Sequence, residues 1–318
     1  MTCKRCQHTA RKFGRYGKRN IQRYRCSTCK ATFSEYEPKL GTHYTAPDVA
    51  AKALAMMLEG MSVRAISRLT GLHKGTILSL MNTASERAAT LLDSTLRNVR
   101  VRYVQADEIW TFVGKKDKRV RVDDPDDFGN QWVFIAIDAE TKLIASHVVG
   151  KRCAETTYSF LEDLRCRVAD ARFQLTTDGF HFYQRGVEDV FAGSCDFAQL
   201  VKLFGDYGQF DTSDARYSPP RISGVISKIR DGRPDPKHIS TSFVERSNLS
   251  LRMHLRRFTR LTNAFSKRLV NLKAAVTLYV AFYNFCRIHQ TLRVTPAMEA
   301  GLADHVWSIC ELLGAAHD

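Results

Sequence analysis

The fold class that the sequence predicts is α/β, a mixed sheet flanked by helices, preceded by a small metal-binding segment and an all-α segment. Three observations lead to it. Four cysteines gather near the N-terminus, helical periodicity fills residues 46–95, and strand and helix patterns alternate from residue 100 onward. The chain of 318 residues is 44% hydrophobic, which is enough for one large domain or a few small ones, each with its own core.

The first segment, residues 1–41, carries two CxxC pairs separated by nineteen residues. Each such pair aims two sulfurs at one point, so together they predict a tetrahedral zinc site formed by Cys3, Cys6, Cys26 and Cys29. A redox pair is the alternative, but thioredoxin-like motifs occur once and inside a βαβ unit. Because this segment has little apolar content, we expect a zinc ribbon that depends on its metal for stability.

The formal charge of +15 is concentrated in two blocks. Residues 1–41 carry eleven Lys and Arg against two acids, and residues 246–293 carry ten against none, whereas residues 42–245 balance at 27 each. This distribution predicts two separate surfaces that contact nucleic acid. Solubilising charge on solvated faces is the alternative, although both blocks also contain aromatic and structure-forming residues.

Residues 42–98 predict an all-α unit with a helix-turn-helix. Ser62 is placed to cap a helix with Leu69 on its inner face, Gly71 makes the turn, and a second helix begins near Lys74. In this layout the second helix enters the major groove of DNA. The residues that it would present are His73, Lys74, Thr76 and Ser79. A plain helical hairpin remains the alternative.

From residue 99 the pattern changes to three strands followed by helix, strand and helix, the order of an RNase H-like core. We therefore expect residues 99–318 to form this core, interrupted by an insertion at about residues 195–238. In that order, Asp107 lies within the first strand and Asp178 at the carboxyl end of the fourth, and such a sheet places these strands side by side. The two acids could then meet at one edge of the sheet.

A close pair of carboxylates repels unless a divalent cation lies between them. Glu245, on a later helix, would complete three oxygen donors suited to Mg²⁺ or Mn²⁺, and two such ions support phosphoryl transfer. Glu108 follows Asp107 on the same strand and should face the opposite side of the sheet, so it is not expected to be a ligand.

Glu245 is the only acid in residues 238–262, a stretch rich in arginine. At helical spacing, one face with Glu245 would also carry the residues that contact DNA, namely Asn248, Arg252 and Arg256. The arginines would hold the phosphate backbone while the acid holds the ion. A structural ion pair between Glu245 and a neighbouring arginine is the alternative.

Four stretches, in this order, resemble the transposases of the insertion-sequence-one family: VQADEIWTFVG, LTTDG, HISTSFVERSNLSLRMHLRRFTRLTNAFSK and YNFCRIHQTLRVTPAMEAG. The zinc ribbon and the helix-turn-helix match that family too. The resemblance implies a DDE transposase in which Asp107, Asp178 and Glu245 are the catalytic, metal-binding triad and Arg252 is the basic position that follows it. It implies binding to the terminal inverted repeats of an insertion sequence, then strand cleavage and strand transfer.

The last of these stretches also resembles a closing motif of integrase-like transposases. Its polar residues would brace the catalytic helix or touch DNA; they are Tyr283, Asn284, Arg287 and His289. Cys286 and His289 have a metal-like spacing, but without a second pair we favour packing.

The expected partners are double-stranded DNA, at the element ends and the target, and a second copy in a homodimer or higher oligomer. We expect no membrane contact, since there is no uninterrupted apolar run of eighteen residues and no signal peptide. The resemblance implies a cytoplasmic, nucleoid-associated protein of a bacterium or archaeon. Two other classes remain open: a catalytically inactive DNA-binding regulator derived from a transposase, and an RNase H-type nuclease that hydrolyses without joining strands.

Overall fold

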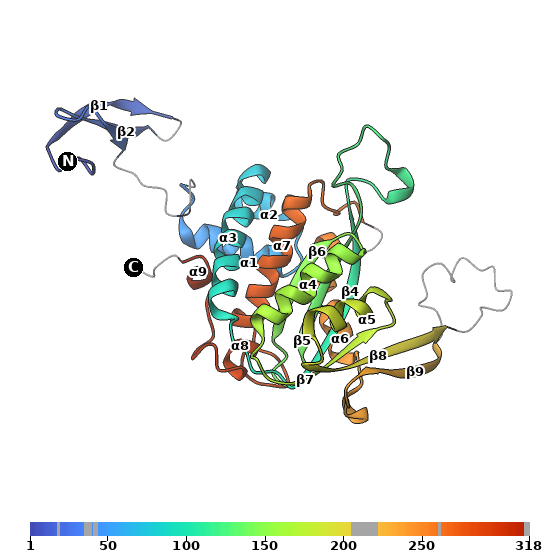
Figure 1. Ribbon diagram of the computed structural model, residues 1–318. Helices are drawn as coiled ribbons and strands as arrows, with labels where there is room; N and C mark the ends of the chain where they lie inside the picture. The colour runs from blue at the N-terminus through green and yellow to red at the C-terminus, as the bar shows by residue number, and fades with distance from the viewer. Residues whose placement is uncertain (18–19, 35–39, 41–43, 205–221, 260–261, 315–318) are drawn as a thin grey trace. The chain divides into compact units, whose positions relative to one another are not determined.

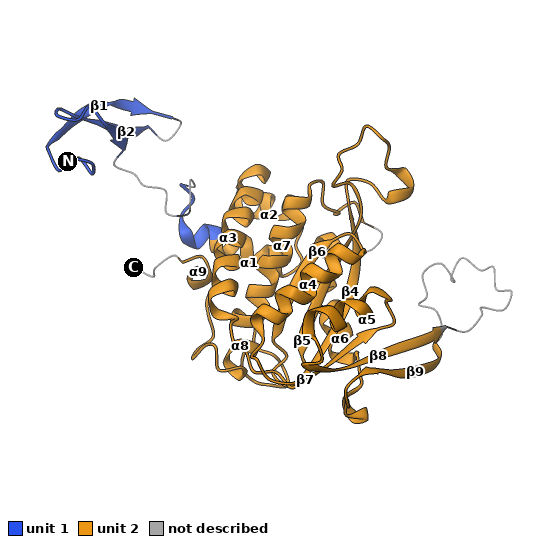
Figure 2. Cartoon of the chain, in the orientation of Figure 1, with its two compact units in different colours: residues 1–50 blue, residues 51–318 orange. Residues whose placement is uncertain are grey.

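The computed structural model describes residues 1–17, 20–34, 40, 44–204, 222–259 and 262–314. The chain divides into two compact units, residues 1–50 and residues 51–318 (Figure 2). The second unit contains both the sheet and most of the predicted helix-turn-helix segment. The predicted division into residues 1–41, 42–98 and 99–318 stays a prediction.

The first unit contains an antiparallel sheet of three short strands (Figure 1). They are β1 (Ala10–Tyr16), β2 (Ile21–Cys26) and β3 (Thr32–Ser34). Six of the seven residues of β1 are exposed, and the buried apolar residues of the ribbon include Cys3, Ala10 and Cys26. With so few buried side chains, burial of apolar surface alone cannot stabilise this sheet.

Three helices follow: α1 (Pro47–Leu58), α2 (Val63–Thr70) and α3 (Lys74–Thr95). The hydroxyl of Ser62 accepts a hydrogen bond from the Ala65 amide at 3.1 Å, and Gly71 ends α2 with a φ of 69°. These contacts confirm the predicted cap and turn. The prediction for Leu69 is wrong, because its side chain is 64% exposed.

The second unit is built on a six-stranded mixed sheet in the order β6-β5-β4-β7-β8-β9. The strands are β4 (Tyr103–Val113), β5 (Gly129–Asp138), β6 (Ile144–Gly150), β7 (Phe173–Asp178), β8 (Cys195–Phe204) and β9 (Ile222–Asp231). Strands β4, β7 and β8 are parallel, and β5, β6 and β9 run antiparallel to their neighbours. The first five strands therefore have RNase H-like order, and the predicted adjacency of the first and fourth strands is confirmed.

The predicted insertion at about residues 195–238 needs a correction at its start. Residues 195–204 form β8, which is hydrogen-bonded in parallel to β7, so they belong to the core sheet. A parallel neighbour for β7 was not evident from the pattern of the segment alone. Strand β9 then pairs antiparallel with β8 and is mostly exposed, while residues 205–221 lie outside the described residues.

Helices cover both faces of the sheet. The longer ones are α4 (Ala154–Arg167), α5 (Phe182–Phe191), α6 (Ser242–His254) and α7 (Leu269–Ala281). On β6, Ser146 bonds to Asp163 of α4 at 2.6 Å, whereas the next residue, His147, bonds to Thr277 of α7 at 3.0 Å. Because successive strand residues point to opposite faces, α4 and α7 lie on opposite sides of the sheet.

Shorter elements join these helices. They are η1 (Asp117–Arg119), η3 (Pro236–His238), η4 (Arg256–Phe258), the π-helical η5 (Phe282–Cys286), α8 (Pro296–Glu299) and α9 (Ile309–Leu312). Asn284 of η5 is fully buried and makes two hydrogen bonds of 3.0 Å with the backbone of Ile144, at the start of β6. It therefore holds η5 to the sheet, and its predicted role in bracing the catalytic helix or touching DNA stays a prediction.

The helix-turn-helix region is packed against the helices that cover the sheet. Helix α3 lies along α7 (Figure 1). His254, the last residue of α6, donates from Nδ1 to the carbonyl of Leu58 at 2.6 Å. A Cβ on Gly60, which follows α1, would lie 2.6 Å from the carbonyl oxygen of Met253, so this close approach requires glycine.

Among the described residues, one helical segment, 269–286, is long and apolar enough to cross a membrane by length and composition. It comprises α7 and η5, and 67% of it is buried inside the protein, as in the core helix of a globular fold. The expectation of no membrane contact stays a prediction.

Candidate functional site

The four N-terminal cysteines converge in the first unit. The Sγ atoms of Cys3 and Cys29 lie 3.5 Å apart, those of Cys6 and Cys26 lie 3.4 Å apart, and all four are within 4.8 Å of one another. Sulfurs bound to one zinc ion at about 2.3 Å lie roughly 3.8 Å apart, so this donor set fits zinc. Backbone amides of the second turn lower the pKa of Cys26, which favours the thiolate that a metal requires.

The ribbon also carries an exposed surface of alternating cations and rings. Phe13 and Tyr16 are 45% and 41% exposed, and the guanidinium of Arg23 lies over both rings at 5.8 and 5.6 Å. Arg25 lies over Phe13 at 5.2 Å. Such a surface offers rings for stacking and cations for phosphate, the two contacts that nucleic acids make.

The residues predicted to enter a DNA groove lie at the start of α3. His73, Lys74 and Ser79 are exposed, and Thr76 is partly buried. His73 also caps α3, since its Nδ1 accepts from the Gly75 amide at 3.1 Å. The start of α3 is thus open to a partner, and the role of these four residues in DNA binding stays a prediction.

In the second unit, three carboxylates converge where β4 and β7 separate. Oxygens of Asp107, Glu108 and Asp178 lie within 4.8 Å of one another, and we call this set the acid cluster. The ladder between β4 and β7 ends at Ala106 and Thr177, one residue before the two aspartates. Beyond that point β4 is paired with β5 but no longer with β7, so this edge of β4 is open. Glu108 also reaches the cluster there, contrary to our expectation.

Burial and the mutual repulsion of the carboxylates raise the pKa values in the acid cluster. Burial and then the charge of Asp178 raise the pKa of Asp107 to about 6. The same two causes, in the same order, raise the pKa of Glu108 to about 8 and outweigh its ion pair with Arg152. Both shifts mean that burial and the neighbouring carboxylate disfavour the ionised forms of Asp107 and Glu108, which a bound cation would favour.

Arg152 supplies a positive charge that partly offsets the carboxylates of the acid cluster. Its Nη2 lies 2.9 Å from Oε2 of Glu108 and 3.4 Å from Oδ2 of Asp178. Its guanidinium stacks over the rings of Trp132 and Phe180 at 4.8 and 3.9 Å, which holds it in place. The opposite oxygen of Glu108, Oε1, is buried, and the buried hydroxyl of Tyr183 lies close enough to lower the Glu108 pKa against the effect of burial.

Helix α6 is fixed over the acid cluster by two side chains of β4 that share one face. Oε1 of Gln105 accepts from the amides of Phe243 at 2.8 Å and Val244 at 3.2 Å, so it caps the first turn of α6. Two residues along β4, Oδ2 of Asp107 accepts from Nδ2 of Asn248 at 2.9 Å. The Oδ1 atom of Asn248 is buried without a partner.

Glu245 lies near the acid cluster but is not one of its members. Its Oε1 is bonded to Lys202 of β8 and to the hydroxyl of Thr241. Its charge nevertheless contributes to the raised pKa of Asp107, after Asp178. The structure therefore brings Asp107 and Asp178 together and leaves Glu245 beside them, paired with a lysine of the sheet and not with a neighbouring arginine of its own helix.

The basic residues around α6 differ in their positions. Arg252 lies on α6, partly buried, whereas Arg256 is exposed in η4, beyond the helix end, so the shared helical face does not extend to it. Arg257 is also in η4 and bonds to Ser266 at 3.0 Å and to Asn271 at 2.5 Å. Its interior position indicates a structural role that the charge pattern did not reveal.

The acid cluster fits a divalent cation by its donor chemistry. Carboxylate oxygens are the ligands that Mg²⁺ and Mn²⁺ prefer, and the buried Oδ1 of Asn248, which has no hydrogen-bond partner among the described residues, is a further oxygen donor beside them. Asp107, Glu108 and Asp178 would hold the ion. The number and identity of the ions remain a proposal.

Comparisons with known proteins give low similarity. No protein-family model matches the chain, and no curated protein matches it. It is similar to piggyBac transposase in a synaptic complex with hairpin DNA, at 9% identity and a TM-score of 0.37, covering 88% of this chain and 72% of that one. It is also similar to Mos1 transposase in a paired-end complex with the left transposon end, at 13% identity and a TM-score of 0.22, covering 49% and 60%. A Mos1 strand transfer complex has 14% identity and a TM-score of 0.22, covering 74% and 78%.

At these identities and scores the alignments carry no argument about function. The fold is established by the sheet order of the chain itself, a six-stranded mixed sheet with helices on both faces. The N-terminal cysteine cluster is consistent with a zinc ribbon.

Proposed function

We propose that the protein is a DNA transposase that binds the terminal inverted repeats of an insertion sequence and catalyses metal-dependent strand cleavage and strand transfer. The observation that carries the proposal is the meeting of Asp107 and Asp178 at the end of the β4–β7 ladder, with α6 capped by Gln105 above them. The sequence resemblance to insertion-sequence-one transposases supports the same assignment.

In this proposal each group has a defined task. Asp107 and Asp178 hold the cation, which when bound would stabilise charge on the oxygens that attack and leave phosphorus. Asn248 orients Asp107 through their hydrogen bond of 2.9 Å. The third carboxylate is Glu245 by resemblance, and Lys202 must release it for that role.

The basic residues would bind the DNA backbone, and the groove-facing residues of α3 would give sequence preference. Water would hydrolyse one phosphodiester bond at each element end, and the 3′-hydroxyl so formed would then displace a 3′-oxygen from a target phosphodiester. Two ends must be held together for this, so we propose a homodimer or higher oligomer on DNA in the cytoplasm, associated with the nucleoid.

The test is a cleavage and strand-transfer assay with Mg²⁺ or Mn²⁺. The substrates are DNA from the regions flanking the gene and a scrambled duplex as control. Asp107→Asn and Asp178→Asn should each reduce cleavage at least about 1,000-fold, equal to about 4 kcal/mol of barrier, and leave end binding unchanged. Cleavage at the wild-type rate by either variant would remove that residue from the proposed site.

Two further variants decide which glutamate is the third ligand. If Glu245 takes part, Glu245→Gln should be as inactive as Asp107→Asn, while Glu108→Gln keeps most of its cleavage. The opposite result would assign the role to Glu108, as the apo geometry places it. Glu188→Gln, on the exposed side of α5, removes the same charge far from the cluster and should have no effect.

The pairing of Glu245 with Lys202 and Thr241 specifically favours a second candidate, a catalytically inactive DNA-binding regulator derived from a transposase. A regulator would bind end DNA and cut neither strand with either metal. A nuclease of the same fold would cut but yield no joined product. The same assay therefore separates all three functions.

A further inference from the structure

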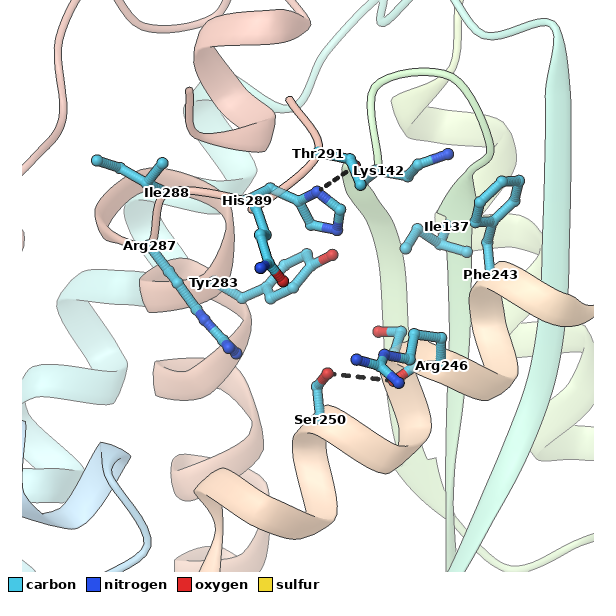
Figure 3. Close-up of a pocket in the computed structure, with 12 residues that line it drawn as sticks. Ile137, Lys142, Phe243, Arg246, Ser250, Tyr283, Arg287, Ile288, His289 and Thr291 are labelled. Atoms are coloured by element: carbon cyan, nitrogen blue, oxygen red, sulfur yellow. Dashed lines mark hydrogen bonds between the residues drawn. The ribbon is translucent and has the colours of Figure 1, made fainter. Parts of the chain in front are cut away.

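A second concave site lies on the side of α6 that faces away from the acid cluster (Figure 3). It is a cavity of about 360 Å³. Its walls come from α6, from the turn between β5 and β6, and from residues 283–291, which begin in η5. This volume is at the lower end of the roughly 300–1,000 Å³ typical of small-molecule sites, so the cavity suits one small ligand.

The position of the cavity follows from the periodicity of α6. Phe243, Arg246 and Ser250 lie on one face of the helix and line the cavity, whereas Glu245 and Asn248 lie on the other. An α-helix with its side chains is about 10–12 Å across. A chain of nucleotides crossing α6 could therefore reach both sites.

The cavity is positively charged. Three cationic groups, from Lys142, Arg246 and Arg287, line it together with His289. None of the twelve described residues in its lining is acidic. Arg287 forms a hydrogen bond with the hydroxyl of Tyr279. Within the described parts of the chain, no carboxylate forms an ion pair with Arg246 or Arg287, and a guanidinium has five N–H donors, so both retain donors for an anion.

Lys142 adds to the positive charge from a buried position. It is only 9% exposed, its ammonium lies 3.2 Å from the centre of the Phe243 ring, and it donates to the carbonyl of Ala139. Asp138 and Glu140 act on it from the same turn without forming an ion pair, and burial lowers its pKa. A cation held in this way favours an anionic ligand nearby.

The cavity also offers a planar apolar surface. Tyr283 is 5% exposed, and its ring lies between the Arg246, Arg287 and His289 side chains, which point toward the same space (Figure 3). The His289 ring is oriented by a hydrogen bond of 3.0 Å to the hydroxyl of Thr291. Rings beside cations are the features that bind an unstacked base together with its phosphate.

We propose that this cavity binds one unstacked nucleotide of a DNA strand, with its phosphate against Arg246 and Arg287 and its base against Tyr283. The site would hold the strand on one side of α6 while the acid cluster acts on the other. The proposal rests on the proposed function only for the source of the nucleotide. Binding in the cavity does not require that the acid cluster cut DNA.

The test uses the full-length, zinc-loaded protein without added Mg²⁺ or Mn²⁺, titrated calorimetrically with thymidine 5′-monophosphate, thymidine and inorganic phosphate. We expect the nucleotide to bind at least about tenfold more tightly than either part, because both halves of the cavity contribute. Equal affinity for the nucleotide and for phosphate would overturn the assignment of a base site. Equal affinity for the nucleotide and for thymidine would overturn the phosphate site.

Variants of the residues that line the cavity test where the ligand binds. Arg246→Gln combined with Arg287→Gln should weaken nucleotide binding at least about tenfold. Tyr283→Leu should weaken binding of the nucleotide while leaving that of phosphate unchanged. Arg185→Gln, on the exposed face of α5, is the matched control and should bind as wild type. Unchanged binding by the double variant, with the fold intact by circular dichroism, would overturn the proposal.

Failure of this proposal and failure of the proposed function are distinguishable. The variant Asp107→Asn with Asp178→Asn should keep nucleotide binding even though it cannot cleave. If the wild type binds the nucleotide but never cuts DNA, the nucleotide site in the cavity is confirmed and the proposed transposase function is wrong. If the wild type cuts end DNA but binds no nucleotide, the cavity assignment alone falls.

Discussion

The cysteine tetrad and the acid cluster both gather ionisable ligands within 4.8 Å, but the chain assembles them differently. The tetrad comes from two local turns in a sheet with few buried side chains. The acid cluster comes from distant strands of a large core and is held by Gln105, Asn248 and Arg152. The comparison teaches that zinc bound by the tetrad would stabilise a fold that has little core of its own, whereas the acid cluster is assembled by a core that needs no metal to form.

The strongest test of this difference is metal removal. Stripping zinc with a chelator, or the change Cys26→Ser, should unfold residues 1–34, because a structural zinc contributes about 10–16 kcal/mol of apparent folding free energy in small domains. Limited proteolysis of the full chain would then cleave within this segment and leave residues 51–204 protected. A ribbon that resists protease without zinc would contradict the dependence.

The next test concerns Arg152, whose positive charge partly offsets the repulsion between the carboxylates of the acid cluster. Arg152→Gln leaves Glu108, whose side chain is 1% exposed, without its cation. We expect a loss of roughly 3 kcal/mol in unfolding free energy, toward the low end for a buried pair because Arg152 is 32% exposed. Urea unfolding at pH 8 measures it.

Added Mg²⁺ or Mn²⁺ should recover much of that loss in the Arg152→Gln protein and change the wild type less. Arg185→Gln is the matched control, since its side chain is 86% exposed. If the divalent cation stabilises both proteins equally, Arg152 is not the group that offsets the repulsion.

A third test separates the acid cluster from another titrating group in the sheet. Burial lowers the pKa of His147 to about 4, below an unfolded value near 6.5, so the unfolded chain binds the proton first. Stability due to neutral His147 is complete above pH 6.5 and falls as the pH drops toward 4. At pH 5 the expected loss is roughly 2 kcal/mol.

The variant His147→Gln keeps a partner for Thr277 without titrating. Its unfolding free energy should therefore fall less than that of the wild type between pH 7 and pH 5, with metal absent from both. Because the acid cluster is the same in the two proteins, it cancels in the difference. Parallel pH curves would show that His147 does not account for the acid sensitivity.

The smallest effect is expected at the cap of α6. Gln105→Leu removes the acceptor for the Phe243 and Val244 amides and should cost roughly 1 kcal/mol, the usual value of a helix cap. Cleavage should fall by more than stability implies, since α6 carries Glu245 and Asn248. A variant with full activity would show that α6 is held by packing alone.

The sequence predicted what depends on local pattern and strand order. Ser62 begins α2 and Gly71 ends it as expected, and the adjacency of Asp107 and Asp178 follows from the order of the strands. Glu108 was missed, because alternation places it on the face opposite Asp107, whereas the β4–β7 ladder ends before both residues and leaves an open edge of β4 where the two side chains can meet. The end of that ladder depends on how β4 and β7 separate, which the pattern does not encode.

Other features depend on contacts between distant segments. Lys202 meets Glu245 only because β8 is part of the sheet, and the segment containing it had been predicted as an insertion. Arg257 lies in the arginine-rich stretch that was expected to hold the phosphate backbone, yet it is bonded to Ser266 and Asn271. The cavity is lined in part by residues that begin in η5, which Asn284 holds against β6. No pattern in the sequence predicted this π-helical turn.

The contact between the ends of α1 and α6 has a mechanical consequence. The contacts of His254 with Leu58 and of Gly60 with Met253 join the end of α1 directly to the end of α6, the helix that carries Glu245. If the proposed function holds, this direct connection would fix the distance along a duplex between the base pairs that α3 contacts and the phosphate that reaches the acid cluster beneath α6. Lengthening the Gly60 junction would shift or blur the position of the cut, while the affinity for the recognised sequence stayed the same.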